Sequence, residues 1–161
     1  MNIRIGQGID FHQLKEGLDL WLGGVKIPSG KGCVAHSDGD VLIHAICDAL
    51  LGAAGQKDIG FFFPDTNNEF RNIDSKILLK RSYEIVKGLG FRIINLDSTI
   101  CLEKPKISQF IDEMRKVIAA ILETETENVT IKATTTEKLG FAGKEEGLFA
   151  LAVVLLNKQI H

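Results

Sequence analysis

The pattern of hydrophobic and polar positions predicts five strands. We expect them at residues 2–12, 18–22, 92–102, 129–133 and 148–156. These segments alternate apolar with polar residues or are rich in Ile, Val, Leu and Thr, which is typical of strands. Because only a short turn separates the first two segments, we expect them to pair with each other as a hairpin.

Three further segments have the apolar spacing of helices. The first helix is expected to begin at a cap at Ser37 or Asp38 and to run to the glycines at 52–55. The others are expected from Asp74 to Lys87 and from Ser108 to Leu122. This order of strands and helices predicts an α+β fold, mostly β sheet, with the helices packed on one face.

The composition limits the classes of protein. The 161 residues are 45% hydrophobic, enough for one small domain, 1–161, around one core. Its 19 Lys and Arg are offset by 21 Asp and Glu, so we expect no nucleic-acid partner. The longest apolar stretch, 149–156, is far shorter than the roughly 20 residues that cross a bilayer. With no export or transit signal at the N-terminus, we expect a cytoplasmic protein without membrane contact.

The three cysteines also argue against export. They are odd in number and form no C-x-x-C pair, so neither a disulfide framework nor a cysteine zinc site is indicated. We expect each thiol to be free and buried.

A first candidate site combines Asp10, His12 and His44. Asp10 and His12 are two positions apart on a predicted strand and therefore point to the same side. With His44 from the first helix they form a ligand set that suits zinc with one open coordination position. Asp40 and Asp48, one helical turn to either side of His44, are each placed to accept its second ring proton. The alternative is polar residues at a turn and a hydrogen-bonded core histidine.

Two loops offer hydrogen-bond donors to phosphate. Residues 35–40 lead into the first helix, whose free N–H groups favour an anion, and His36 and Ser37 add side-chain donors. Residues 133–144 combine threonines, lysines and glycines with Glu137, a hard oxygen ligand suited to magnesium between phosphate oxygens. A plain helix cap and a solvated threonine-rich loop remain the alternatives.

Four blocks of sequence resemble the signature of the 2-C-methyl-D-erythritol 2,4-cyclodiphosphate synthases. The blocks are GIDFH at 8–12, AHSDGDVLIHAICDALLGAAG at 35–55, DIGFFFPDT at 58–66 and KATTTEKLGFAGKEEG at 132–147. They occur in the family's order and span nearly the whole chain. The resemblance implies a phosphorus–oxygen lyase of non-mevalonate isoprenoid precursor synthesis. Its reaction converts 4-diphosphocytidyl-2-C-methyl-D-erythritol 2-phosphate to the cyclic diphosphate and releases CMP.

The resemblance also implies roles for individual residues. Asp10, His12 and His44 would bind zinc, and Glu137 a magnesium or manganese ion, while His36 and Thr135 would stabilise the transition state. The substrate-binding residues it implies are Asp10, His12, His36, Ser37, Asp58, Ile59, Gly60, Phe63, Pro64, Asp65, Thr66, Asn67, Leu102, Glu103, Lys104, Pro105, Lys106, Ile107, Ser108, Thr134, Thr135, Thr136, Glu137, Phe141 and Lys144. Among these, 58–60 and 63–67 would contact the methylerythritol part, and 102–108 would form the cytidine pocket.

Enzymes of this family form homotrimers, so the resemblance implies a homotrimer with each site shared by two neighbouring subunits. The ligand would be a small molecule linked to cytidine diphosphate. Two other functions are compatible with the same residues. A zinc hydrolase is one, because two histidines and a carboxylate also suit water activation. A non-catalytic trimeric protein that binds diphosphates is the other.

Overall fold

The computed structural model describes residues 2–158. In chain order the elements are β1 (Ile3–Glu16), β2 (Leu20–Leu22), β3 (Val25–Ile27), β4 (Lys31–Val34), α1 (Val41–Ala53), α2 (Ile59–Phe62), α3 (Ser75–Gly88), β5 (Phe91–Cys101), α4 (Ile111–Ile121), β6 (Val129–Thr134), α5 (Gly140–Gly143) and β7 (Gly147–Lys158), with 3-10 turns at Asn68–Phe70, Ser108–Phe110 and Thr126–Asn128.

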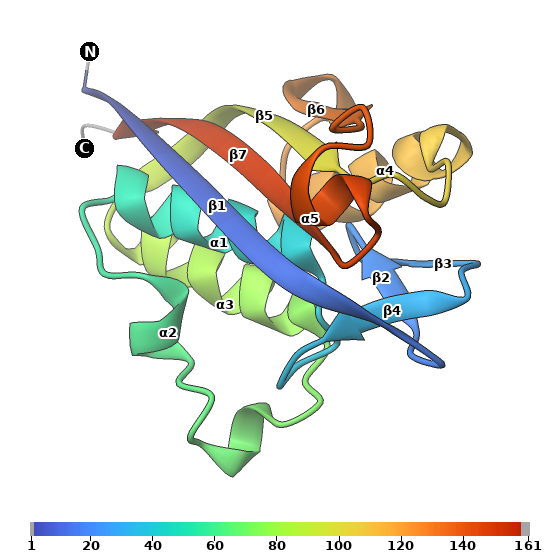
Figure 1. Cartoon of the computed structure of the whole chain (residues 1–161). Coiled ribbons are helices and arrows are strands. Elements are labelled where there is room, and N and C mark those ends of the chain that lie inside the picture. The colour runs from blue at the N-terminus through green and yellow to red at the C-terminus, as the bar shows by residue number, and fades with distance from the viewer. Residues whose placement is uncertain (1, 159–161) are drawn as a thin grey trace.

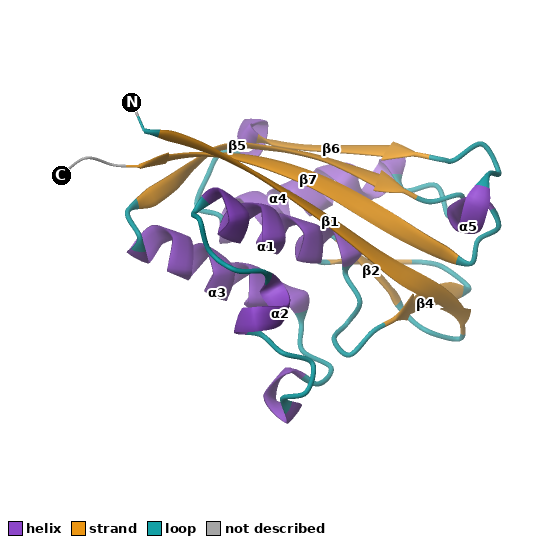
Figure 2. Cartoon of the chain, turned by 60° about the vertical axis from the view of Figure 1, so that its left-hand side comes forward, coloured by secondary structure: helices purple, strands orange, loops and turns teal. Residues whose placement is uncertain are grey.

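Five strands form one mixed sheet in the order β4-β1-β7-β5-β6. The long strands β1 and β7 pair antiparallel from Ile3 opposite Asn157 to Gln13 opposite Gly147. β5 is antiparallel to β7 and parallel to β6. Helices α1, α3 and α4 lie on one side of this sheet (Figures 1 and 2). The predicted α+β class and the placement of the helices are therefore confirmed.

The predicted hairpin between the first two strands is wrong. Residues 20–22 form β2, which pairs with β3 in a separate two-stranded sheet, and the end of β1 pairs with β4. Gly23 and Gly24, with φ of 60° and 78°, make the tight turn between β2 and β3. Two consecutive residues at positive φ form the turn that suits a two-residue hairpin, so this glycine pair connects β2 to the strand that follows it.

The start of the first helix also differs from the prediction. The N-cap is Asp40, neither Ser37 nor Asp38, and its carboxylate accepts a hydrogen bond from the Ile43 N–H at 3.0 Å. Gly39 has a φ of 75°, which keeps the preceding residues out of the helix. The second helix begins after Asp74, as predicted, and the residues at 108–110 form a 3-10 turn before α4.

Helix α1 lies directly on β1 and β7, and most of its residues are fully buried. The contact depends on two glycines of β1. A Cβ at Gly6 would lie 2.1 Å from the carbonyl oxygen of Ala49, and one at Gly8 would lie 1.9 Å from that of Ala45. Residues at alternate positions share one side of a strand, so Asp10 and His12 also point towards α1.

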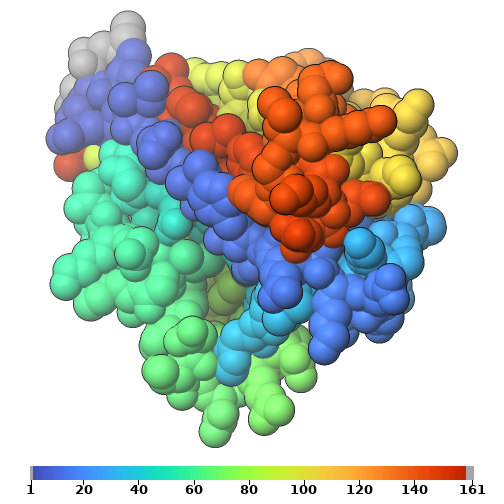
Figure 3. Space-filling model, viewed as in Figure 1, coloured from blue at the N-terminus to red at the C-terminus, as the bar shows by residue number. Residues whose placement is uncertain are grey.

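The opposite side of the sheet exposes apolar side chains. Ile5 and Phe11 of β1 are 71% and 52% exposed, and Leu151 and Val153 of β7 are 38% and 42% exposed. The two strands run side by side across the molecule in Figure 3. Exposed apolar side chains gathered on one face in this way are typical of an interface with another protein chain.

Two other predictions concern the cysteines and the membrane. Cys33, Cys47 and Cys101 are free and buried, as expected. Within residues 2–158, none of the helices has the length and apolar character needed to span a bilayer.

Candidate metal and substrate site

Asp10 and His12 of β1 and His44 of α1 bring three potential metal ligands together. Asp10 Oδ2 lies 3.0 Å from His12 Nε2 and 3.1 Å from His44 Nδ1, and the two ring nitrogens are 3.1 Å apart. Zinc bonds of about 2.0–2.1 Å place the ligands of a tetrahedron roughly 3.3 Å apart. The three atoms therefore match one face of such a tetrahedron, and the arrangement fits a divalent metal ion.

The three ligands perturb one another. Burial would raise the pKa of Asp10, but hydrogen bonds to His12 and His44 outweigh it and lower this pKa from 3.8 to about 2. Burial would lower the pKa of His44, but its hydrogen bond to Asp10 and the charges of Asp10, Asp40 and Asp38 raise this pKa above 6.5. The site thus favours positive charge beside a carboxylate, which is what a bound cation requires.

The second nitrogen of His44 does not bond to the residues that we predicted. His44 Nε2 lies 2.9 Å from Ser75 Oγ at the start of α3 and 3.2 Å from Ser37 Oγ. The prediction that Asp40 or Asp48 accepts this ring proton is wrong. No signal in the sequence indicated this contact, because Ser75 and His44 are 31 positions apart and lie on different helices.

The carboxylates of Asp40 and Asp48 instead accept hydrogen bonds from backbone N–H groups. Asp40 is fully buried and accepts the N–H groups of Gly23, Gly24 and Ile43 at 2.7–3.0 Å. Asp48 accepts the N–H of Ile59 at 2.7 Å. Asp40 therefore joins α1 to the turn of the β2–β3 hairpin, and Asp48 holds the start of α2.

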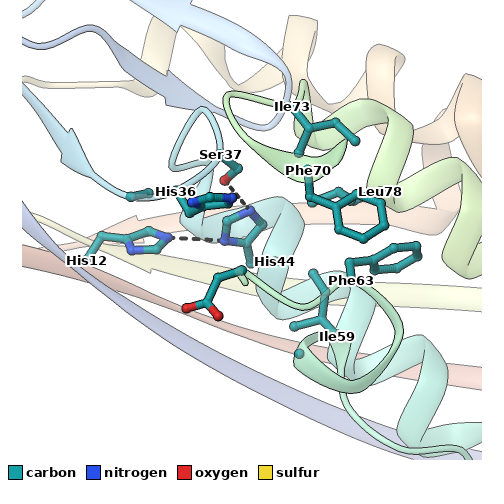
Figure 4. Close-up of a pocket in the computed structure, with 12 residues that line it drawn as sticks. His12, His36, Ser37, His44, Ile59, Phe63, Phe70, Ile73 and Leu78 are labelled. Atoms are coloured by element: carbon teal, nitrogen blue, oxygen red, sulfur yellow. Dashed lines mark hydrogen bonds between the residues drawn. The ribbon is translucent and has the colours of Figure 1, made fainter. Parts of the chain in front are cut away.

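A cavity of about 320 Å³ opens beside the metal ligands. Its lining residues are His12, Ala35, His36, Ser37, His44, Ile59, Gly60, Phe63, Asp65, Phe70, Ile73 and Leu78. In the close-up, the imidazoles and Ser37 lie on one side and the apolar side chains on the other (Figure 4). In Figure 3, a hollow separates the blue strand β1 from the green segment that contains residues 59–70. The cavity can therefore hold a molecule with a charged part and an apolar part.

His36 has one ring nitrogen, the buried Nε2, that forms no hydrogen bond within residues 2–158. A buried polar atom without a partner costs free energy unless a ligand or water satisfies it. His36 lines the cavity beside His12 and His44, so its ring borders the space that a ligand would occupy.

The cavity includes part of the predicted methylerythritol segment. Ile59, Gly60, Phe63 and Asp65 line it, whereas Pro64, Thr66 and Asn67 do not. Asp58 caps α2 through the N–H of Phe61. The apolar wall formed by Phe70, Ile73 and Leu78 was missed, because from sequence alone these positions look like ordinary core.

A second cavity, of about 190 Å³, lies where β5 and β6 end. Its lining residues are Leu102, Glu103, Pro105, Lys106, Ile107, Ser108, Ala133, Thr134 and Thr135. The predicted cytidine segment and part of the threonine-rich segment therefore meet in one hollow. Lys104 points elsewhere, with its ammonium 3.9 Å from the Glu145 carboxylate.

Glu103 connects this cavity to the loop that contains Glu137. Its carboxylate accepts the N–H groups of Thr136 and Lys138 at 3.2 and 3.1 Å. Glu137 and Lys138 have φ of 53° and 65°, an unfavourable region for residues with a side chain. Glu103 thus helps to hold a strained turn in place.

The two cavities share no lining residue. The triad and His36 line or border the first, while Thr135 and most of the predicted cytidine segment line the second. Thr136, Glu137, Phe141 and Lys144 line neither. Phe141 instead packs beside Phe11, with ring centroids 6.0 Å apart and ring planes inclined by 58°. The described chain therefore carries two separate cavities, one beside the triad and one beside Thr135.

Comparisons with known proteins place this arrangement in a family. The model of the YgbB family matches residues 3–157. The chain is 54% identical over 158 residues to the 2-C-methyl-D-erythritol 2,4-cyclodiphosphate synthase of Bacteroides thetaiotaomicron, covering 98% of this chain and 99% of that protein. The likeness extends over the segments of both cavities.

Solved structures have the same fold. The bifunctional IspDF of Campylobacter jejuni superposes with a TM-score of 0.94 at 44% identity, over 98% of this chain and 43% of that longer one. The CDP complex of IspF from Plasmodium falciparum gives 0.87 at 35% identity, over 99% and 98% of the two chains. The curated relatives are named 2-C-methyl-D-erythritol 2,4-cyclodiphosphate synthases. The α+β fold, the convergent triad and the full-length match together show that this chain belongs to the same family, the YgbB family.

Proposed function

We propose that this protein converts 4-diphosphocytidyl-2-C-methyl-D-erythritol 2-phosphate to 2-C-methyl-D-erythritol 2,4-cyclodiphosphate and releases CMP, as an enzyme of isoprenoid precursor synthesis. The observation that carries the proposal is the triad of Asp10, His12 and His44 at the edge of a cavity that His36 also lines. The names of its relatives support the same reaction.

The triad would hold zinc, since two imidazoles and one carboxylate leave a fourth position open. Glu137 would hold a second ion, magnesium or manganese, through a hard carboxylate oxygen. When bound, such cations draw electron density from phosphate oxygens and neutralise the charge that develops during phosphoryl transfer. The distances of 3.0–3.1 Å within the triad support the first site.

The reaction joins two ends of one molecule. An oxygen of the 2-phosphate attacks the β-phosphorus, a new P–O bond closes the ring, and the bond from the β-phosphorus to the bridging oxygen breaks. CMP leaves with that oxygen. Because nucleophile and leaving group belong to the same substrate, holding them in line is a large part of the catalysis. No covalent intermediate with the protein is required.

The first cavity would position the reacting end of the substrate. Its apolar wall, with Ile59 and Phe63, would hold the methylerythritol carbon chain and exclude water, and Asp65 would accept a hydrogen bond from a hydroxyl. His36 Nε2 and Ser37 Oγ would donate hydrogen bonds to phosphate oxygens. Asp58 and the flanking residues Pro64, Thr66 and Asn67 would shape this loop.

The second cavity would take the cytidine end. Pro105 and five other residues of the 102–108 segment surround a hollow large enough for part of a nucleoside. Thr134, Thr135 and Thr136 would contact the diphosphate, with Thr135 stabilising the transition state beside the ion on Glu137. Phe141 and Lys144 would complete the surroundings, the ammonium of Lys144 adding positive charge.

These roles require that two subunits share each site, and we propose a homotrimer. The separation of the two cavities within one chain supports this assembly, because neither cavity alone contains both the metal triad and Thr135. The exposed apolar face of β1 and β7 offers the surface that would be buried between subunits. The place of action proposed for the enzyme is the cytoplasm.

Phosphorus NMR on the purified protein with the cytidine-linked substrate, zinc and magnesium tests the proposal. Joint appearance of CMP and a cyclic diphosphate is the expected result. CMP with a linear diphosphate would point instead to a zinc hydrolase. Tight binding of the substrate without turnover, in zinc-loaded protein, would favour a non-catalytic diphosphate-binding protein.

A further inference from the structure

The His44 ring has different partners at its two nitrogens. Nδ1 faces Asp10 and His12, while Nε2 lies 2.9 Å from Ser75 Oγ. Ser75 is fully buried in the first turn of α3, 31 positions further along the chain. A proposed metal ligand on one helix is thus tied to the beginning of another.

The direction of this hydrogen bond follows from the partner of Ser75. The Ser75 hydroxyl has a single hydrogen and bonds to Asp38 Oδ1, and a carboxylate can only accept. Asp38 is held in this position because its Oδ2 accepts the Ser75 N–H at 2.8 Å. With its hydrogen directed at Asp38, Ser75 Oγ can only accept from His44.

The Ser75 hydroxyl then favours the His44 tautomer with hydrogen on Nε2, in competition with Asp10 Oδ2, which lies 3.1 Å from Nδ1 and favours the other tautomer. If Nε2 carries the ring hydrogen, the neutral imidazole presents a lone pair at Nδ1, the atom that faces Asp10 and His12. Ser37 Oγ, 3.2 Å from the same Nε2, accepts the N–H of Gly39 and is a second, longer acceptor. The ring is therefore held from the side opposite to the triad.

We infer that Ser75 and Asp38 are positioning residues that set the tautomer and orientation of His44 for metal binding, an inference that rests on the proposed metal site. In many metal sites a carboxylate or carbonyl accepts the second ring proton of a histidine directly. Here a serine hydroxyl stands between ring and carboxylate. Ser75 also closely follows Ile73, which lines the first cavity, so the orientation of His44 is linked to the wall that would hold the substrate.

The tautomer can be measured without metal or substrate. Protein with ¹⁵N-labelled histidine, prepared metal-free and kept at alkaline pH where the ring is neutral, gives separate signals for protonated and unprotonated ring nitrogens. We expect wild-type His44 to carry its hydrogen on Nε2. A hydrogen on Nδ1 would overturn the inference, and this measurement requires no variant.

Ser75→Ala supplies the second test. We expect a mixture of His44 tautomers and a zinc dissociation constant raised roughly 10–100-fold. Ser82→Ala is the matched control, because Ser82 is also fully buried on α3 and lies about two helical turns beyond Ser75. The control should leave the tautomer and the zinc affinity as in the wild type.

The outcomes separate this inference from the proposed function. If folded Ser75→Ala protein keeps the wild-type tautomer and zinc affinity, the roles of Ser75 and Asp38 are wrong although the metal site stands. A wild-type protein that binds no zinc would contradict the metal site itself. In that case the Nε2 hydrogen would still establish the hydrogen-bond direction, but a role in metal binding would be overturned.

Discussion

The Nε2 atom of His12 and the Nδ1 atom of His44 lie 3.1 Å apart, although the two residues are 32 positions apart in the sequence. Two ring N–H groups cannot point at each other at this distance, so at least one nitrogen presents a lone pair. Both nitrogens also face the same carboxylate oxygen of Asp10. The fold thus concentrates electron pairs where a cation would sit.

Removal of one ligand should abolish metal binding without loss of the fold. We expect His44→Ala to lose zinc and activity, because only two ligands would remain. Metal analysis after dialysis, with circular dichroism to check folding, measures this. His36→Ala is the control: it should lose activity but keep zinc, since His36 lines the cavity outside the triad. A wild-type zinc content in His44→Ala would contradict the assignment.

Zinc affinity should fall as the pH is lowered through the raised pKa of His44, because protons then compete for Nδ1. Isothermal titration over a pH series checks this. An affinity that does not change between neutral and mildly acidic pH would be inconsistent with His44 as a ligand.

The stability of the metal-free protein should also depend on pH. The raised pKa of His44 stabilises the fold below pH 6.5, and this contribution is lost as the pH rises through the folded-state pKa. Asp10, with its pKa lowered from 3.8 to about 2, contributes above pH 3.8 and loses this contribution as the pH falls towards 2. Urea unfolding against pH should show both trends, and His44→Ala should lack the first.

Asp40→Asn should destabilise the protein by about 1–3 kcal/mol. The carboxylate now accepts hydrogen bonds from three backbone N–H groups, and the amide would turn its own NH2 group towards some of these donors. These donors are the N–H groups of Gly23, Gly24 and Ile43. Urea denaturation measures the change in the free energy of unfolding. Asp19→Asn, at an exposed ion pair with Lys26, should have little effect. Equal stabilities of the two variants would mean that the buried carboxylate has no special role.

Two inactive variants should restore activity together if neighbouring subunits share each site. His44→Ala lacks the triad and Thr135→Ala lacks the other half, so mixed trimers would contain some sites with both halves intact. Subunits exchanged by mild denaturation and refolding should therefore regain part of the wild-type rate. Each variant refolded alone is the control. A mixture as inactive as its components would place the whole site in one chain.

The sequence pattern predicted most of the large sheet and the three long helices, because the segments at 92–102, 129–133 and 148–156 are rich in residues typical of strands. It failed for β2, where the pairing partner depended on the turn at Gly23 and Gly24. The position of Asp40 could not be predicted for the same reason. Its carboxylate accepts hydrogen bonds from Gly23 and Gly24, which only folding brings close to it.

The triad could be predicted from the sequence because Asp10 and His12 share one side of a strand and His44 lies in a polar stripe of an otherwise apolar helix. The hydrogen bonds that link His44 to Ser75 and Ser75 to Asp38 could not be predicted. Ser75 and Asp38 are 37 positions apart, and no periodicity links a serine at one helix start to the loop before another. The apolar wall with Phe70 was equally hidden, since a side chain that lines a cavity and one that fills a core have the same pattern.

The close seating of α1 on Gly6 and Gly8 has a consequence for how this protein can vary. The distance between the strand that carries two ligands and the helix that carries the third is set by backbone contact, so any side chain at these glycines would separate the ligands. In a library of random variants selected for activity, these two positions should therefore tolerate change as poorly as the ligands themselves, although neither glycine takes part in any chemistry.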